Sequence, residues 1–431
     1  MLRIITQLTD LRAELRRICD RTDSSEMSQQ HATVATILQR VAADGDRALI
    51  EYTRTFDHID LTPETLRIKG DELDAAYQQV SKELLDAIRL AKQRIEAFHR
   101  QRVPKSWVQF GEDGIVLGKR YTAVDSAGLY IPGGRAAYPS TVLMNAVPAQ
   151  VAGVKRIVMV TPPGQGKGVN PAVLVAAQEA GIQEIYRVGG AQAIAALAYG
   201  TETIPRVDVI TGPGNLYVTL AKKQVYGRVG IDSLAGPSEV LIIADEYAHP
   251  VHIAADLLAQ AEHDPLAAAI LLTPSSRLAE AVVAAVNAQL TDHPRRLLTE
   301  KAIAHYGLIG IVENLEQAID LSNSFAPEHL ELEVDDPWSL VEKVRHAGAI
   351  FLGYATPEAV GDYLAGPNHT LPTSGSARYA SALGVETFLK HSSLIQYTPA
   401  ALLKQGGAVM TLAETEGLIS HRDSVRLRIE P

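Results

Sequence analysis

The sequence predicts an α/β protein whose sheets are mostly parallel. From about residue 120 onward, short apolar runs of strand length recur along the chain. Between several of these runs, apolar residues stand three and four positions apart, which is the spacing of an amphipathic helix. The composition, 46% hydrophobic and 21% charged, is ordinary for a globular protein with a buried core. Strands that alternate with helices are typical of layered α/β folds.

The first quarter of the chain reads as helical. Residues 1–25 mix acids with arginines and lack an apolar core, so they predict a short amphipathic helical segment and not a signal peptide. Residues 31–102 repeat the helical spacing in two long stretches. Pro104 and the glycines of "QFGEDGIVLG" then break the pattern.

The strands come next, and their grouping predicts the domains. Eight apolar runs read as strands, at residues 156–163, 184–190, 208–214, 239–245, 268–274, 309–314, 330–334 and 348–353. We predict a first α/β domain made of residues 26–129 and 238–380, and a second made of residues 130–237. Residues 381–431 form a tail with little core of its own, which must pack on something else, such as another subunit. Ligands of parallel sheets bind beyond the carboxyl ends of the strands, so the loops after the strands are where we expect the site.

Composition and charge exclude several classes of function. Forty basic and fifty acidic residues give a net charge of −10, which opposes binding to a nucleic-acid backbone. No apolar run approaches the roughly 18 residues that a membrane-spanning helix needs. Cys19 is the single cysteine, which rules out an internal disulfide and a thiolate metal cluster. We expect a cytoplasmic protein that binds neither nucleic acid nor membrane.

Three glycine-rich loops are candidates for holding a phosphate or a dinucleotide. They are "YIPGGRAAYPST" at 130–141, "VGGAQAI" at 188–194 and "TGPGNLYV" at 211–218. Glycine lets backbone N–H groups approach an anion closely, and a helix N-terminus adds a favourable dipole. None of the loops matches the G-x-G-x-x-G fingerprint, so tight turns of an α/β fold are the alternative interpretation.

A metal site can be assembled from separated stretches. In "LLAQAEHDP", an amide and an imidazole stand three positions apart and share a helix face. Borderline metals accept nitrogen and oxygen ligands, and two further candidates come from "VGDYLAGPNHT" and "EGLISHRD". The resulting ligand candidates are Gln260, His263, Asp362 and His421. The pair His249 and His252 has the same spacing and competes with it, and histidines near helix ends also serve as simple hydrogen-bonding groups.

An acid and a base stand side by side in "SFAPEHLELEV", residues 324–334. Glu328 and His329 follow Pro327, and neighbours in sequence point in different directions. Carboxylate and imidazole are common proton-transfer groups, so the pair is a candidate for acid–base catalysis. The alternative is that the two residues merely begin a surface strand after a turn.

Eight motifs together resemble a known family. "YIPGG", "GGAQAIAALAYGT", "GPGN", "AGPSEVLIIAD", "DLLAQAEHDP", "FAPEHLEL", "GPNHTLPT" and "AETEGLISH" occur in this order, and the set resembles histidinol dehydrogenase from about residue 30 to the C-terminus. The resemblance implies a zinc- and NAD-dependent oxidation of L-histidinol through the aldehyde to L-histidine. It also implies two Rossmann-like domains without the fingerprint, and a homodimer whose C-terminal tails are exchanged.

The resemblance assigns roles to individual residues. It implies one zinc ion per subunit on the four ligand candidates named above, with His329 as general base and Glu328 as the group that activates water. The implied substrate contacts are Ser238, Gln260, His263, His329, Asp362, Glu416 and His421. The implied NAD contacts are Tyr130, as a ring to stack on, Gln192 and Asn215. Glu416 and His421 would reach the site of the other subunit, and His369 would lie near the substrate.

Two other functions fit parts of the same pattern. A zinc hydrolase using Glu328 to activate water would turn over without NAD. A non-catalytic α/β ligand-binding relative would need no proton-transfer group, which the intact pair at 328–329 argues against.

Overall fold

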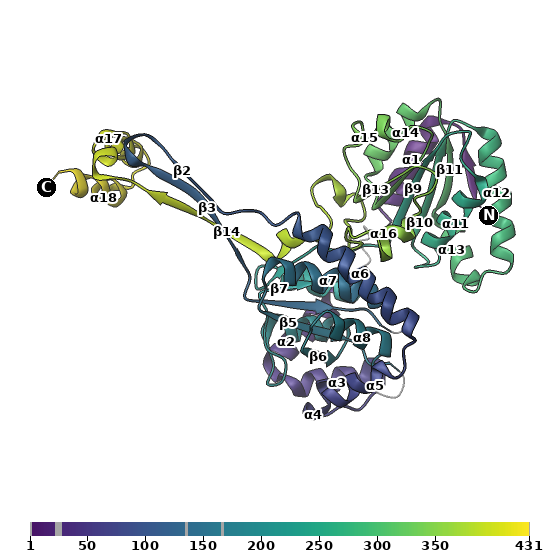
Figure 1. Ribbon diagram of the computed structural model, residues 1–431, viewed down its shortest axis with the longest axis horizontal. Coiled ribbons are helices and arrows are strands. Elements are labelled where there is room, and N and C mark those ends of the chain that lie inside the picture. Colours follow the sequence, from purple (N-terminus) through teal and green to yellow (C-terminus); the bar gives the residue numbers. More distant parts are fainter. Residues whose placement is uncertain (1, 22–27, 134–136, 165–167, 431) are drawn as a thin grey trace.

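The structure is a computed structural model and describes residues 2–21, 28–133, 137–164 and 168–430. Figure 1 shows two bodies, each built on a sheet, and a long arm that carries the C-terminus away from both. The predicted α/β class with parallel sheets is confirmed. No helix in these ranges is both long and apolar enough to cross a membrane.

The larger sheet has six strands, and all of its neighbouring pairs are parallel. Their order is β1 (Arg3–Ile5), β11 (Gly307–Ile311), β10 (Ala268–Thr273), β9 (Glu239–Ala244), β12 (His329–Glu333) and β13 (Ala349–Leu352). One face packs against α11 (Pro250–Ala261), α12 (Ser276–Thr291) and α13 (Arg296–Tyr306). The other face packs against α1 (Leu8–Cys19), α14 (Leu315–Phe325) and α15 (Trp338–Val341).

The smaller sheet has five strands and is also parallel throughout. Their order is β6 (Glu184–Arg187), β5 (Arg156–Thr161), β4 (Ser126–Tyr130), β7 (Val209–Thr211) and β8 (Gly230–Ile231). One face packs against α2 (Ser28–Asp44), α3 (Asp46–Asp57), α9 (Gly190–Tyr199) and α10 (Leu216–Val225). The other packs against α5 (Gly70–Tyr77), α6 (Lys82–Arg100), α7 (Pro139–Ala152) and α8 (Pro171–Glu179), and the short α4 (Pro63–Leu66) precedes α5.

The packing of the N-terminal third differs from the predicted grouping. We placed residues 26–129 with the larger sheet, but Val34, Leu49 and Ile95 are buried in the two cores of the smaller one. The helical spacing was correct, but an apolar stripe does not specify which sheet will cover it. Residues 1–25 are also not a separate segment, because β1 joins the edge of the larger sheet and α1 lies in its core. The domain boundaries themselves remain a prediction.

The arm is an antiparallel ribbon capped by two helices. β14 (Leu389–Gln396) pairs with β3 (Val116–Ala123), which pairs with β2 (Trp107–Phe110); α17 (Pro399–Thr415) and α18 (Ile419–Ile429) follow. Phe110, Ile395 and Leu412 are 78%, 71% and 65% exposed, and α18 has no buried residue. The tail therefore has little core of its own, as predicted. Its partner strands β2 and β3 were not predicted, because the glycines at 111–118 also fit a simple break in the helical pattern.

Candidate functional site

The candidate acid–base pair, Glu328 and His329, lies at a strand reversal of the larger sheet. From β9 the chain proceeds through β10 and β11 to one side, and then returns to place β12 on the other side of β9. Glu328 and His329 stand where β12 begins, beside the start of β9, with His329 in register with Val240. The expectation that the site follows the strands is wrong here, because Glu328 immediately precedes β12 and His329 begins it, at the amino ends of parallel strands.

Glu328 and His329 lie at a tight turn between α14 and β12. Helix α14 ends at Ala326, whose φ of 58° is in the left-handed region, and Pro327 cannot continue the helix. The next strand approaches so closely that a Cβ on Gly348 would lie 2.5 Å from the Glu328 carbonyl oxygen. Glu328 and His329 are 5% and 4% exposed, so they do not begin a surface strand.

Glu239, the first residue of β9, holds both members of the pair. Its backbone N–H donates to Glu328 Oε2 at 2.9 Å, and its carbonyl oxygen lies 3.0 Å from His329 Nδ1. Because a carbonyl only accepts, Nδ1 carries the proton, and Nε2 is left as a proton acceptor. His329 Nε2 is buried and has no hydrogen-bond partner among the described residues. The Ser238 side chain lies close enough to Glu328 to lower the pKa of its carboxyl group.

Burial sets the protonation states of the pair. It lowers the pKa of His329 to about 3, so the imidazole is neutral at physiological pH. It raises the pKa of Glu328 well above its ordinary value, and the neighbouring carboxyl groups of Glu239 and Asp362 raise it further. A neutral imidazole with a free nitrogen can accept a proton, and the carboxyl group can hold or exchange one.

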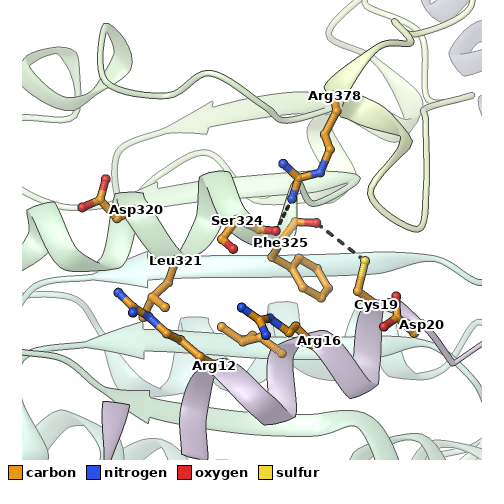
Figure 2. A pocket seen from close by; sticks show the side chains of 10 residues that line it. Arg12, Arg16, Cys19, Asp20, Asp320, Leu321, Ser324, Phe325 and Arg378 are labelled. Carbon is orange, nitrogen blue, oxygen red and sulfur yellow. Dashed lines mark hydrogen bonds between the residues drawn. The ribbon is translucent and has the colours of Figure 1, made fainter. Parts of the chain in front are cut away.

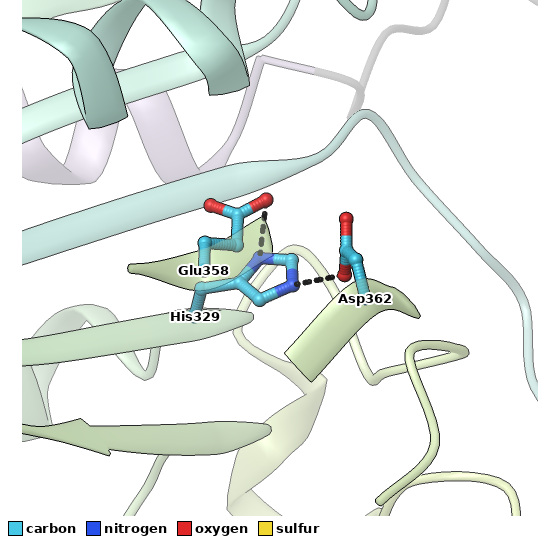
Figure 3. A group of neighbouring side chains, drawn as sticks. All are labelled: His329, Glu358 and Asp362. Atoms are coloured by element: carbon cyan, nitrogen blue, oxygen red, sulfur yellow. Dashed lines mark ion pairs between the residues drawn. The ribbon is translucent and has the colours of Figure 1, made fainter. Parts of the chain in front are cut away.

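A carboxylate lies near each nitrogen of the imidazole (Figure 3). Asp362 Oδ1 lies 3.8 Å from His329 Nε2, and Glu358 Oε1 lies 3.8 Å from Nδ1. Each of these three residues offers a ligand atom, and the three atoms lie within 4.8 Å of one another. The Gln260 amide, oriented by its hydrogen bonds, donates to both Glu358 carboxylate oxygens at 2.9 Å, which leaves its oxygen available as a ligand.

The structure brings most of the predicted site residues together. His263 follows the end of α11 and is close enough to His329 and His369 to lower the pKa of both. His369 Nδ1 donates to the Asp362 carbonyl oxygen at 3.0 Å, and its Nε2 lies 3.3 Å from the Thr141 hydroxyl. Gln260, His263, Asp362 and Ser238 therefore surround the catalytic pair.

Two predicted residues lie far from this group within the chain. Glu416 caps the end of α17 and His421 lies in α18, both at the outer end of the arm in Figure 1. The competing histidines stack on each other with ring centres 4.4 Å apart. They are exposed and lie at the opposite end of α11 from Gln260, so they do not join the group.

The predicted NAD residues lie at the strand reversal of the smaller sheet. β4, β5 and β6 proceed to one side, and β7 and β8 to the other. Tyr130 ends β4, Gln192 lies in the first turn of α9, and the Asn215 side chain caps α10 by accepting from Val218 N–H at 3.2 Å. All three stand at carboxyl ends, where α/β sheets bind nucleotides. Part of the first glycine-rich loop, residues 134–136, lies outside the described residues.

Tyr130 differs from the expected stacking platform. Its ring is 4% exposed and packs in a core of the smaller sheet, and its hydroxyl accepts from Gly190 N–H at 3.2 Å. The tyrosine thus ties the end of β4 to the glycine-rich start of α9. Gln192 is buried, and both polar atoms of its amide lack a hydrogen-bond partner in the described part of the chain.

Known proteins that resemble the chain show which family it belongs to. Residues 20–429 match the family model described as histidinol dehydrogenase. The chain belongs to the histidinol dehydrogenase family. Membership confirms the resemblance seen in the motifs and makes the chain an enzyme, an oxidoreductase of histidine biosynthesis.

Individual histidinol dehydrogenases resemble the chain over its full length. That of Thermosynechococcus vestitus is 91% identical over 431 residues and covers 100% of both chains. Histidinol dehydrogenase 2 of Trichormus variabilis is 73% identical over 430 residues, covering 100% of this chain and 99% of its own. The crystal structure of the Elizabethkingia anophelis enzyme matches with a TM-score of 0.93 at 38% identity, covering 99% and 97% of the two chains.

Two residues of this candidate site were not predicted from the sequence. Glu358 stands four positions before Asp362 on α16 (Glu358–Tyr363), a helical spacing that could have signalled a shared face. Glu239 gave no local signal, because it contacts the pair across 89 and 90 positions of sequence. A second group of carboxyl side chains lies nearby: Glu331 and Glu333 of β12 are buried, and Asp256 of α11 is half-buried.

A separate cavity of about 470 Å³ opens between α1 and α14, and its lining includes none of the predicted site residues (Figure 2). Arginine and aspartate side chains of both helices surround it. Cys19 Sγ, at its edge, lies 4.0 Å from the Phe325 carbonyl oxygen. The end of α1 therefore contacts Phe325, which stands three residues before Glu328.

Proposed function

We propose that the chain catalyses the zinc-dependent, NAD-linked, four-electron oxidation of L-histidinol through L-histidinaldehyde to L-histidine. The observation that carries the proposal is the tautomer of His329. Its Nδ1 is engaged by the Glu239 carbonyl, and its unpartnered Nε2 faces Asp362. A base in this form, next to a second titratable carboxyl group, suits two successive proton removals.

The donor set fits a divalent cation. Burial raises the pKa of Asp362 to about 7 and that of Glu358 well above its ordinary value. Within the described residues, neither carboxylate forms an ion pair with a lysine or arginine. The ligands we propose are Gln260, His263 and Asp362, completed by His421 of a second subunit. When bound, zinc supplies a Lewis-acidic anchor for the amine and imidazole of histidinol.

His329 and Glu328 divide the proton transfers. In the first oxidation, His329 Nε2 accepts the hydroxyl proton as hydride leaves the same carbon. An aldehyde has no hydroxyl proton, so water must add before the second oxidation can occur. Glu328 removes a proton from that water, and His329 then accepts the proton of the hydrate as the second hydride leaves. The two side chains diverge from one corner, which lets them address different atoms of one reacting carbon.

NAD is proposed to bind at the strand reversal of the smaller sheet. The N-termini of α9 and α10 supply backbone N–H groups and a dipole that suit the pyrophosphate. Gln192 has a buried amide without a hydrogen-bond partner among the described residues, and Asn215 is exposed at the start of α10. Two NAD molecules would be used in succession for each histidinol.

The decisive measurement is the absorbance of reduced nicotinamide with histidinol and NAD in the zinc-loaded protein. We expect turnover that a chelator abolishes and added zinc restores. An inactive zinc-loaded protein would contradict the proposal. Release of a cleaved amide or ester without NAD would instead support the hydrolase.

The shared site calls for a separate experiment. The exposed arm, which carries Glu416 and His421, supports a homodimer in which each tail completes the other subunit's site. Mixing inactive His329→Ala and His421→Ala chains should restore part of the activity, since one mixed site then keeps both residues. Continued inactivity, with subunit exchange shown by mass spectrometry, would contradict sharing.

A further inference from the structure

One residue controls the placement of both catalytic groups. Glu328 and His329 are hydrogen-bonded to the N–H and the carbonyl of Glu239, respectively. Any displacement of Glu239 therefore moves both groups and frees His329 Nδ1. Whatever fixes Glu239 also fixes the catalytic geometry.

The side chain of Glu239 is fixed by a buried ion pair. Arg21 Nη1 lies 2.9 Å from Glu239 Oε1, and the two side chains are 1% and 0% exposed. An uncompensated carboxylate at such a depth is costly, so the guanidinium is what holds the Glu239 side chain in place.

Arg21 also holds the chain that leads into Glu239. Its Nη2 donates to the Pro237 carbonyl at 2.9 Å, and its Nε donates to the Leu266 carbonyl at 2.8 Å. Its Nη1 donates in addition to the Ile18 carbonyl at 2.7 Å, at the end of α1. The planar fork of arginine joins α1 to the starts of β9 and β10, which the single ammonium group of lysine cannot reproduce.

The same end of α1 touches the other side of the catalytic corner. Cys19 lies against the Phe325 carbonyl, as the dashed line in Figure 2 shows. The end of α1 thus contacts both chain segments that meet at the pair: the start of β9 through Arg21, and the end of α14 through Cys19.

We propose that Arg21 and Glu239 are positioning residues for the catalytic pair. Their buried ion pair holds the Glu239 peptide groups in place, and these hold Glu328 and keep the proton of His329 on Nδ1. This inference rests on the proposed function, because it concerns the rate of both oxidations. It assigns to the N-terminal helix a role in catalysis without contact to substrate.

The test compares Arg21→Met, Arg21→Lys and the double variant Arg21→Met/Glu239→Leu as zinc-loaded proteins. The double variant removes the pair without leaving a lone buried charge, so it serves as the folded comparison if Arg21→Met alone unfolds. Arg16→Met, exposed on the same helix, is the matched control. We expect kcat of both oxidations to fall about 100-fold in the double variant, the cost of a roughly 1 Å misplacement. The KM for NAD and the zinc retained against a chelator should stay within about twofold, as expected of a residue far from both ligands.

A spectroscopic signal separates positioning from general damage. Nitrogen-15 shifts of the His329 ring report which nitrogen carries the proton, and we expect the Nδ1–H form to lose its dominance in the Met variants. We expect Arg21→Lys to keep the fold but to lose about tenfold in kcat, since the fork is lost while the charge remains.

The outcomes separate this inference from the proposed function. A folded double variant with native kcat, or one that loses kcat together with zinc while the His329 tautomer is unchanged, would overturn it. If the native protein fails to reduce NAD, the proposed function is wrong. The tautomer measurement would still decide what Arg21 does.

Discussion

The two parallel sheets share one topology but present their sites at opposite edges. In the smaller sheet, Tyr130 and Asn215 flank the reversal between β4 and β7 at the carboxyl ends. In the larger sheet, Glu239 and His329 flank the reversal between β9 and β12 at the amino ends. The rule that ligands bind at the carboxyl ends of strands agrees with the proposed NAD site but not with the position of Glu328 and His329.

The difference follows from helix polarity and suits the two ligands. At the carboxyl edge of the smaller sheet, α9 and α10 begin, and helix N-termini favour anions such as a pyrophosphate. At the amino edge of the larger sheet, α11 ends with Gln260 in its last turn, and helix C-termini favour cations. An α/β sheet therefore has two chemically different edges. The proposed NAD site uses the edge that favours anions, and the proposed zinc site uses the edge that favours cations.

Removing the base should have the largest effect. We expect His329→Ala to lower kcat of both oxidations by about 10²- to 10⁴-fold, the usual contribution of a positioned general base. Glu328→Gln should slow histidine formation while sparing aldehyde formation, because only the second oxidation needs activated water. Rapid-quench assays that start from histidinol and from the aldehyde separate the two steps. Equal losses in both steps for both variants would refute the division of roles.

We expect zinc binding at the amino edge of the larger sheet to depend on Glu358. Glu358→Gln replaces the acceptor of the Gln260 amide by a group that does not fix its orientation. We expect zinc affinity, measured by chelator competition, to fall about 10- to 100-fold, as for other partners of metal ligands. Glu342→Gln, an exposed glutamate, is the control. Unchanged affinity in Glu358→Gln would mean that this carboxylate does not orient the ligand.

The carboxyl edge should depend on Asn215 for NAD. Asn215→Ala should raise the KM for NAD about tenfold while leaving kcat within about twofold, as expected when uniform binding is lost. Asn170→Ala is a matched control, because Asn170 also caps a helix, accepting from Ala172 N–H at 2.9 Å away from the strand reversal. Both variants lose about 1 kcal/mol of capping stability. A KM that rises equally in both would point to stability and not to contact with NAD.

We expect the smallest effect in the pH dependence of the stability, through the buried Glu333 of the larger sheet. Burial raises the pKa of Glu333 to about 8. The folded state therefore binds more protons than the unfolded state between the ordinary and the raised pKa, and stability falls as pH rises through this window. Glu333→Gln removes the titration, so its melting temperature should exceed the native value at pH 9 by about 2 °C or more and match it near pH 5. A constant difference at both pH values would exclude Glu333 as the source.

Much of the fold and part of the candidate site could be predicted from local patterns in the sequence. The eight apolar runs are strands, since apolar spacing and chain breaks are properties of neighbouring residues. The pair at 328–329 was visible for the same reason, because its members adjoin. The motifs around Gln260, His263 and Asp362 identified the family before any of them were seen to meet.

Tertiary structure alone decided which sheet residues 28–100 cover, which edge carries the catalytic pair, and which residues support it. Arg21 reaches Glu239 across 218 positions, and Glu239 reaches Glu328 across 89, so no spacing along the chain records either contact. A sequence states which side chains are charged or apolar. Only the packing of distant segments determines which of these side chains are buried together. Burial in turn shifts the pKa values of the charged side chains, and this determines what chemistry they can perform.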